Sequence, residues 1–216
     1  MFELFSSKVF EIGFRSTINS HWFKQMTQDN IYAPTTVDLT APIEGAPNFY
    51  VVSKTKLIVL FVATMGLYTV YWSYKNWQIY KEATGYSAWP VLRGIFPYFF
   101  MHSLYRSVDG KINASGRSYP WSPSTLATSF VAVLLIDKVL DRMVAKGAGY
   151  PFTDIASLVL VPVMIMILLP AQRAINFAEN DPDGESNSKF TALNYLWIVI
   201  GAAAWVLVAI GMFIPE

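Results

Sequence analysis

Residues 154–173 read DIASLVLVPVMIMILLPAQR, an apolar run with no formal charge between Asp154 and Arg173. A helix needs about 20 predominantly apolar residues to cross the hydrocarbon core of a bilayer. This stretch therefore predicts a membrane-spanning helix. Three more runs predict spans by the same criterion: 57–74, 118–136 and 190–215. The chain is expected to be all-α, a polytopic bundle of membrane helices.

The composition of the 216 residues supports a membrane protein and excludes several other classes. Hydrophobic residues make up 54% and charged residues only 14%, against about 25% charged residues in soluble domains. The net charge of +1 gives no electrostatic reason to expect a nucleic-acid partner. The absence of cysteine excludes disulfides, thiolate metal sites and cysteine nucleophiles.

The predicted organisation has two parts. Residues 1–52 form an N-terminal tail and linker, and residues 53–216 form the membrane domain. The first span belongs to a long helix that Ser53 caps and Gly85 ends. The predicted membrane segments are four spans, near 54–76, 123–146, 154–173 and 190–213, and one short or re-entrant segment near 89–106.

The short segment near 89–106 is ambiguous. Arg93, Pro97 and Arg106 interrupt or end it, and the two arginines do not share one face of a regular helix. One alternative is that Pro97 breaks the segment into a re-entrant pair, which we favour. The other is that the segment crosses the membrane with both arginines reaching outward.

This ambiguity decides the topology. If the segment does not cross, the six Lys and Arg residues of 75–117 favour a cytoplasmic position for that stretch and an N-terminus outside. If it crosses, the positive charges nearly balance across the membrane. A tail of about fifty residues without a signal sequence is more easily left inside. These arguments conflict, so the orientation stays open.

Aromatic and basic residues near the end of the first span predict anchors at the membrane–water interface, where amphipathic rings are enriched. These anchors are Tyr71, Trp72, Lys75, Trp77 and, in the short segment, Arg93. The aromatic residues fall all round the helix, which fits an interfacial belt better than a recognition surface. Ligand binding by cation–π contacts is the alternative.

Four charged residues follow the apolar run 118–136: Asp137, Lys138, Asp141 and Arg142. Charges inside a membrane are costly, so a paired set facing a water-filled interior would indicate an ion or proton pathway. The simpler interpretation, which we favour, is a helix that leaves the membrane early and ends in solvated turns. In both cases Lys138 is expected to pair with Asp141 at i,i+3.

Other candidate chemistry is sparse, and we assign no catalytic, cofactor-binding or metal-binding residue. The histidines His21 and His102 lack metal-ligand spacing and lie in unlike segments. Asp181–Glu185 predicts a turn rather than a calcium loop. The small residues of Gly201–Ala204 offer a surface that another helix can approach closely, from within the bundle or from another membrane protein.

The stretch Thr64-Met-Gly-Leu-Tyr-Thr-Val-Tyr-Trp-Ser-Tyr-Lys-Asn-Trp77 resembles the leading motif of an uncharacterised family of bacterial inner-membrane proteins, Thr-x-Gly-[Leu/Ile]-Tyr-x-x-Tyr-Trp-x-Tyr-Lys-Asn-Trp. Further similarity lies in Arg93–Phe96, Leu104–Tyr105, Leu169–Asn176 and Asn194–Gly201. The resemblance implies a multi-pass protein of the bacterial inner (cytoplasmic) membrane and brings no known activity. Met26–Pro34 resembles the opening of many such proteins, which implies that residues 1–25 are an over-extended translation start.

Together these features predict an accessory or scaffolding membrane protein, with membrane lipids as partners and no nucleic acid. The reason is that packing and interfacial features outnumber convergent polar chemistry. The alternative is a small transporter or an ion or proton pathway built on the charged end of the span near 123–146. An enzyme is not favoured, because the sequence offers no evident nucleophile or acid–base pair.

Overall fold

The structure, a computed structural model, describes residues 46–213. Most of the predicted tail and linker, including the proposed start at Met26, lies outside these residues. The described part is helical, with no strand between residues 46 and 213. Its elements in chain order are α2 (Lys54–Ala63), α3 (Tyr68–Thr84), α4 (Pro90–Ile95), α5 (Pro97–Ala114), α6 (Pro123–Val144), α7 (Phe152–Ala178), the short 3-10 helix η1 (Glu185–Asn187) and α8 (Ala192–Phe213).

Three of these helices, α6, α7 and α8, are long and apolar enough to cross a membrane. They coincide with three of the four predicted spans and confirm the all-helical class. This indicates a membrane protein. Helix α7 continues through Pro162 and Pro170.

The first predicted span is divided, which differs from the uninterrupted helix expected between Ser53 and Gly85. The expected ends are confirmed: Ser53 accepts a hydrogen bond from the Lys56 backbone, and Gly85 ends α3 in the left-handed conformation. In the middle, Met65 and Gly66 have φ values of 51° and 85°. A right-handed helix cannot pass through two left-handed residues, so α2 and α3 are separate helices.

The turn between α2 and α3 leaves no backbone N–H group unpaired from Thr64 to Val70. The amide of Gly66 donates to the Phe61 carbonyl over 2.9 Å, and the Tyr68 amide donates to the Thr64 hydroxyl over 2.9 Å. Carbonyl oxygens within the turn and the end of α2 accept the other five. Irregular backbone tolerates an apolar environment only when its polar groups are satisfied in this way.

The segment near 89–106 is also divided, at Phe96, into α4 and α5. Pro97 occupies the first turn of α5, so the break at this proline follows the favoured interpretation. Helix α5 continues to Ala114, beyond the predicted end of the segment. Helix α4 lies against α3 at Gly94, where an added Cβ would lie 2.9 Å from the Tyr74 Cβ and 3.0 Å from the Val70 carbonyl oxygen.

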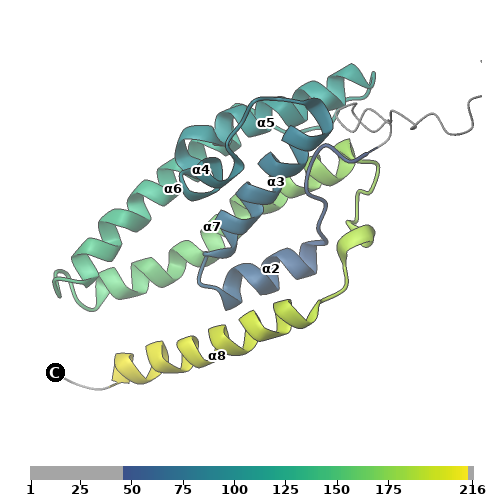
Figure 1. Cartoon of the computed structure of the whole chain (residues 1–216). Helices are drawn as coiled ribbons and strands as arrows, with labels where there is room; N and C mark the ends of the chain where they lie inside the picture. The colour runs from purple at the N-terminus through teal and green to yellow at the C-terminus, as the bar shows by residue number, and fades with distance from the viewer. Residues whose placement is uncertain (1–45, 214–216) are drawn as a thin grey trace, which may run out of the picture. The chain divides into compact units, whose positions relative to one another are not determined.

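The helices form one bundle (Figure 1). Helices α5, α6 and α7 pack on one another, α3 packs on α4, and α2 lies between α7 and α8. Among the described helices, α8 contacts α2 alone. That contact is close at Gly201, where a Cβ would lie 1.7 Å from the Ala63 carbonyl oxygen, and the Trp205 indole donates to the Val62 carbonyl over 2.8 Å.

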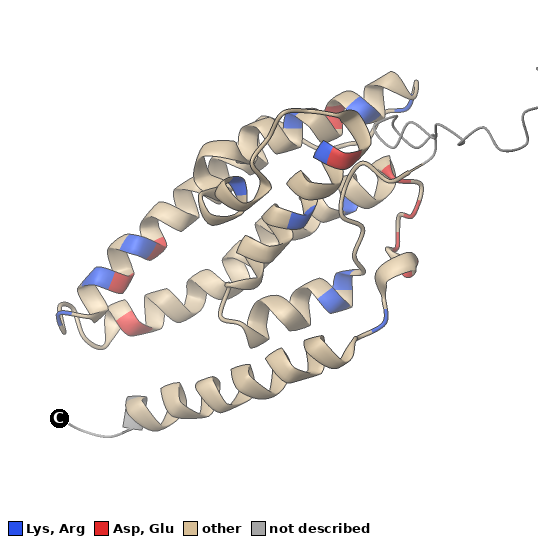
Figure 2. Ribbon diagram, viewed as in Figure 1, with Lys and Arg blue, Asp and Glu red and all other residues tan. Residues whose placement is uncertain are grey.

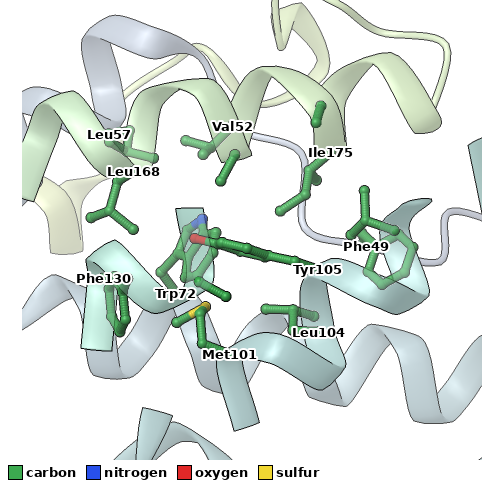
Figure 3. Close-up of a cluster of buried hydrophobic side chains, with 14 of the residues drawn as sticks. Phe49, Val52, Leu57, Trp72, Met101, Leu104, Tyr105, Phe130, Leu168 and Ile175 are labelled. Atoms are coloured by element: carbon green, nitrogen blue, oxygen red, sulfur yellow. The ribbon is translucent and has the colours of Figure 1, made fainter. Parts of the chain in front are cut away.

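The core lies where α3, α5, α6 and α7 meet (Figure 3). Trp72, Tyr105, Phe130 and Leu168 fill it and are at most 2% exposed. Phe49 and Val52, from the extended segment before α2, are fully buried in the same cluster. This extended segment, residues 48–53, is called the strap below.

Most charged residues lie toward the two ends of the bundle, and basic residues of α3 and α4 lie between them (Figure 2). One end, called the strap end, holds the strap and the 179–191 loop. The other, called the α6–α7 end, holds the last turns of α6 and the first turn of α7. Between them, residues 118–136, 155–172 and 190–213 carry no formal charge. The molecule therefore has an apolar middle bounded by two polar ends, as a membrane protein requires.

Candidate functional site

The most extensive polar arrangement lies at the strap end, where side chains of α3 and α7 bind the strap backbone. The Tyr50 amide donates to Asn76 Oδ1 over 3.1 Å, and Gln172 Nε2 donates to the Tyr50 carbonyl over 3.0 Å. Asn176 Nδ2 donates to the Val52 carbonyl over 3.0 Å. Two helices therefore hold one extended segment.

The amides of this arrangement are buried and bonded to one another. Gln172 Nε2 also donates to Asn176 Oδ1 over 2.7 Å, and the Trp72 indole N–H donates to Gln172 Oε1. Asn76, Gln172 and Asn176 are at most 3% exposed. Buried polar groups are costly unless they are hydrogen-bonded. This network therefore fixes the strap in one position.

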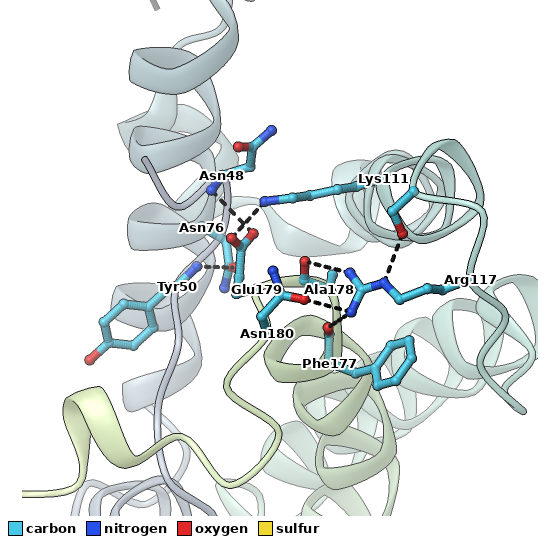
Figure 4. Close-up of polar contacts among 10 residues, drawn as sticks. Asn48, Tyr50, Asn76, Lys111, Arg117, Phe177, Ala178, Glu179 and Asn180 are labelled. Carbon is cyan, nitrogen blue, oxygen red and sulfur yellow. Dashed lines mark hydrogen bonds and ion pairs between the residues drawn. The ribbon is translucent and has the colours of Figure 1, made fainter. Parts of the chain in front are cut away.

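A second layer of the site involves charges (Figure 4). Lys111 Nζ lies 2.6 Å from Glu179 Oε2, and the Glu179 side chain is only 4% exposed. The other oxygen of Glu179 accepts the Asn48 amide over 3.1 Å. A buried carboxylate needs such a partner, since an isolated one is strongly destabilising. Glu179 thus joins α5, α7 and the strap.

Arg117 closes the carboxyl end of α7. Its guanidinium donates to the carbonyls of Phe177 and Ala178 over 3.0 and 3.3 Å and to Asn180 Oδ1 over 2.8 Å. The same group lies 4.7 Å from the Phe177 ring centroid. A cation at the end of a helix satisfies the last carbonyls and interacts favourably with the helix dipole.

The 179–191 loop packs against the strap. Lys56 Nζ donates to Asn187 Oδ1 over 2.6 Å and to the Lys189 carbonyl over 2.7 Å. The predicted turn is confirmed, because the Gly184 amide donates to the Asp181 carbonyl over 3.0 Å. Gly184 has φ 69°, and a Cβ there would lie 2.5 Å from the Val52 carbonyl carbon. Only glycine fits this contact.

Asp181 organises the same loop. Its carboxylate accepts the backbone amides of Glu185 and Ser186, each over 2.9 Å. Burial would raise the pKa of Asp181, but the hydrogen bonds from Ser186, Glu185 and Gly184 outweigh it and hold that pKa below its usual range. The carboxylate therefore stays ionised in its loop.

The predicted interfacial anchors fall into two groups. Tyr71 is 47% exposed, and Lys75 is half-buried and donates to Gln78 Oε1. Trp72 and Trp77 are each 1% exposed. The structure places these two indoles inside the protein, so neither faces lipid from the helix surface as a belt residue does. Trp72 is buried because its indole N–H donates a hydrogen bond to Gln172, a partner 100 positions away.

Arg93 lies against aromatic rings. Its guanidinium carbon is 4.0 Å from the Trp77 ring centroid, 4.8 Å from that of Phe100 and 5.2 Å from that of Tyr86. Stacking on aromatic faces is a favourable position for a guanidinium. Trp77, one of the aromatic residues that the sequence offered for cation–π recognition of a ligand, thus stacks on the protein's own arginine.

The four candidate charges near residue 140 lie on the last turns of α6. Lys138 Nζ lies 2.7 Å from Asp141 Oδ2 and 3.2 Å from Asp137 Oδ2, which confirms the predicted i,i+3 pair. The side chains of Asp137, Lys138 and Asp141 are 33%, 68% and 52% exposed, and Arg142 is exposed. Asp137, Lys138 and Asp141 are paired with one another, and none of the four residues is buried within the bundle.

Asp137 and Lys138 border a cavity of about 610 Å³. Its other walls are the α2–α3 turn, the break between α4 and α5, and facing stretches of α6 and α7. Leu160, Val161 and Met164 supply the α7 wall. The lining is mainly apolar.

The buried amides of the strap end, together with Glu179 and Arg117, hold the chain's own structure, because they are engaged with backbone groups and with one another. Within residues 46–213, no three histidine, cysteine, aspartate or glutamate side chains are close enough to hold a metal ion. The sequence predicted no functional role for Asn76, Gln172, Asn176 or Glu179. A signal for three of them was present, since Asn76, Gln172 and Asn176 lie in the motifs of the resemblance.

Comparison with protein-family models, with curated proteins and with solved structures finds no match. The class therefore rests on the architecture alone: an all-helical membrane protein with three membrane-length apolar helices.

Proposed function

We propose that this protein is a non-catalytic accessory component of the bacterial inner membrane, a scaffold that binds another membrane protein along α8. The observation that carries the proposal is that α8, an apolar helix of membrane length, contacts only α2 among the described helices. Gly201 and Trp205 face α2, whereas Ala202 and Ala203 are exposed. Small residues allow close helix–helix approach within a membrane.

The polar network at the strap end supports the same function. It engages the buried amides and Glu179 in fixing the chain's own strap, so these groups are not available to a substrate. A rigid polar end and an unpartnered apolar helix suit a scaffold. The resemblance described above supports a bacterial inner membrane.

An ion or proton pathway has less support. Such a pathway needs polar groups along its length. Between the strap end and Asp137, the buried residues described on α6 and α7 are apolar: Ala127, Phe130, Val133, Met164 and Leu168. The Asp137–Lys138–Asp141 group, none of which is buried, fits the solvated helix end better than a conducting site.

We also propose that the strap end faces the cytoplasm. Lys and Arg residues lie mainly on the strap side of the bundle (Figure 2), and cytoplasmic segments carry an excess of these residues. If α6, α7 and α8 alone cross the membrane, the segments on the strap side carry Lys54, Lys56, Lys75, Lys81, Arg93, Arg106, Lys111, Arg117, Arg173 and Lys189, and the α6–α7 connection carries Lys138, Arg142 and Lys146.

A re-entrant α2–α3 pair removes the conflict over orientation. Gly201, which lies beside the end of α2, is nine residues after the first residue of α8. This corresponds to about 14 Å along the helix. That is about half of a hydrocarbon core of about 30 Å. If α2 and α3 enter and leave on the strap side, the N-terminal segment and residues 75–117 both lie in the cytoplasm. Three crossings then remain.

Photo-crosslinking tests the scaffold proposal. A photoreactive residue at Ala203 is expected to give a discrete protein adduct in native membranes. The matched control is Leu135, which is 57% exposed on α6 and is expected to give lipid adducts only. Ala203→Trp should remove the adduct formed from Leu207 on the same helix without changing thermal stability. Lipid adducts alone at Ala203 and Leu207 would contradict the proposal.

A further inference from the structure

A second cavity, of about 370 Å³, lies at the strap end between α2, α7 and the 179–191 loop. Lys54 and Arg173 are the two cations of its lining, and Asp183 is the one carboxylate. Leu169, Tyr119 and Phe177 give it an apolar wall. The rings of Tyr119 and Phe177 lie 4.9 Å apart and are tilted by 35°.

The two cations lie where the apolar runs of their helices stop. Arg173 follows the charge-free residues 155–172, and Lys54 begins α2, whose charge-free run starts at Leu57. Both are therefore at the level of lipid headgroups if α7 crosses the membrane and α2 enters it. Both side chains belong to exposed residues, and neither forms an ion pair with another described residue.

The lining carries a net charge of +1, since two cations face one carboxylate. This charge complements a headgroup with a net charge of −1. A phosphate diester suits the cations because Arg and Lys donate charge-assisted hydrogen bonds to its oxygens. The apolar wall suits the first methylene groups of a lipid chain. Basic recesses between membrane helices on the cytoplasmic side are typical sites for anionic lipid headgroups.

We propose that this cavity binds the headgroup of an anionic phospholipid from the strap-side leaflet, with its phosphate between Lys54 and Arg173. The hydroxyl groups of a glycerol headgroup can donate to Asp183, which accounts for a carboxylate in a site for an anion. The site includes Gln172 and Asn176 in its lining. A bound lipid would therefore lie directly over the network that holds the strap.

Native mass spectrometry of the full chain in a neutral detergent tests the proposal, with phosphatidylglycerol titrated against phosphatidylethanolamine and phosphatidylcholine. Phosphatidylglycerol is expected to bind most tightly. Lys54→Gln combined with Arg173→Gln should weaken its binding about 30-fold, because each cation near an anionic surface contributes about fivefold. The matched control is Lys138→Gln combined with Arg142→Gln, which removes two cations at the α6–α7 end and should leave the affinity unchanged.

Three results would overturn the proposal. The first is equal binding of the three lipids, and the second is an equal loss of affinity in both double variants. The third is competition by millimolar inorganic phosphate, which would assign the site to a free anion. Thermal unfolding of the lipid-free variants checks that they are folded: an unchanged melting temperature with weaker binding supports the lipid site. A double variant that unfolds would be replaced by Lys54→Arg with Arg173→Lys, which keeps both charges and should retain binding.

Discussion

At the residue scale, Gln172 is central to the strap network, because it links Trp72, Tyr50 and Asn176. Gln172→Ala would leave the Trp72 indole N–H and the Tyr50 carbonyl without this partner, at a cost of about 1–3 kcal/mol for each group. We expect a clear fall in the midpoint of thermal unfolding in detergent. The control is Gln78→Ala on α3, whose partners Lys75 and Glu82 are not buried, so its effect should stay within about 0.5 kcal/mol. Equal shifts for both variants would refute the structural role.

The residues of the candidate sites differ in how far the sequence predicted them. Lys138 and Asp141 are three positions apart on one helix, so their pairing followed from helix geometry. The strap network joins residues that are distant in sequence: Val52 and Asn176 are separated by 124 positions. No local pattern encodes such a contact. The burial of Trp72 was missed for the same reason, because its partner on α7 is visible only in the fold.

At the element scale, hydropathy predicted α6, α7 and α8, since a continuous apolar run and a membrane-length helix are nearly the same observation. It did not predict the division of 54–84. Residues 57–74 are free of charge throughout, and hydropathy does not register backbone conformation. The left-handed Met65 and Gly66 interrupt the helix without interrupting the apolar run. Gly66 alone is a weak signal, because a single glycine inside an apolar helix is often tolerated.

The contact between α2 and α8 depends on one glycine and can be tested by substitution. Because a Cβ at Gly201 would lie 1.7 Å from the Ala63 carbonyl oxygen, Gly201→Ala should force the two helices apart. Overpacking of this kind costs about 1–3 kcal/mol. Gly211→Ala on the same helix meets nothing within 4 Å and should be neutral or slightly stabilising, since alanine favours a helix by up to about 1 kcal/mol over glycine. Thermal unfolding of the two variants measures the difference, and a neutral Gly201→Ala would exclude the close contact.

At the scale of the whole molecule, the number of crossings decides which side each polar end faces. The chain has no cysteine, so single cysteines at exposed positions report on accessibility without a background. With three crossings, cysteines at Pro47, Ser118 and Ser186 lie on the strap side, and a cysteine at Ala148 lies on the other. In bacterial cells with a permeabilised outer membrane, an impermeant maleimide should label Ala148→Cys at once. It should label the other three only after the inner membrane is opened.

The four-span alternative gives a different pattern, because a crossing by residues 54–76 separates Pro47 from Ser118. Rapid labelling of Pro47→Cys together with Ala148→Cys, with Ser118→Cys protected, would show that the α2–α3 pair crosses the membrane. Labelling of Pro47, Ser118 and Ser186 from outside, with Ala148 protected, would retain the three crossings but reverse the orientation. The positive charges argue against that result, because ten Lys and Arg residues would then lie outside and three inside. The expected pattern places α4 and α5 on the strap side without a crossing, and Lys54 and Arg173 in the cytoplasmic leaflet, where anionic lipids are found.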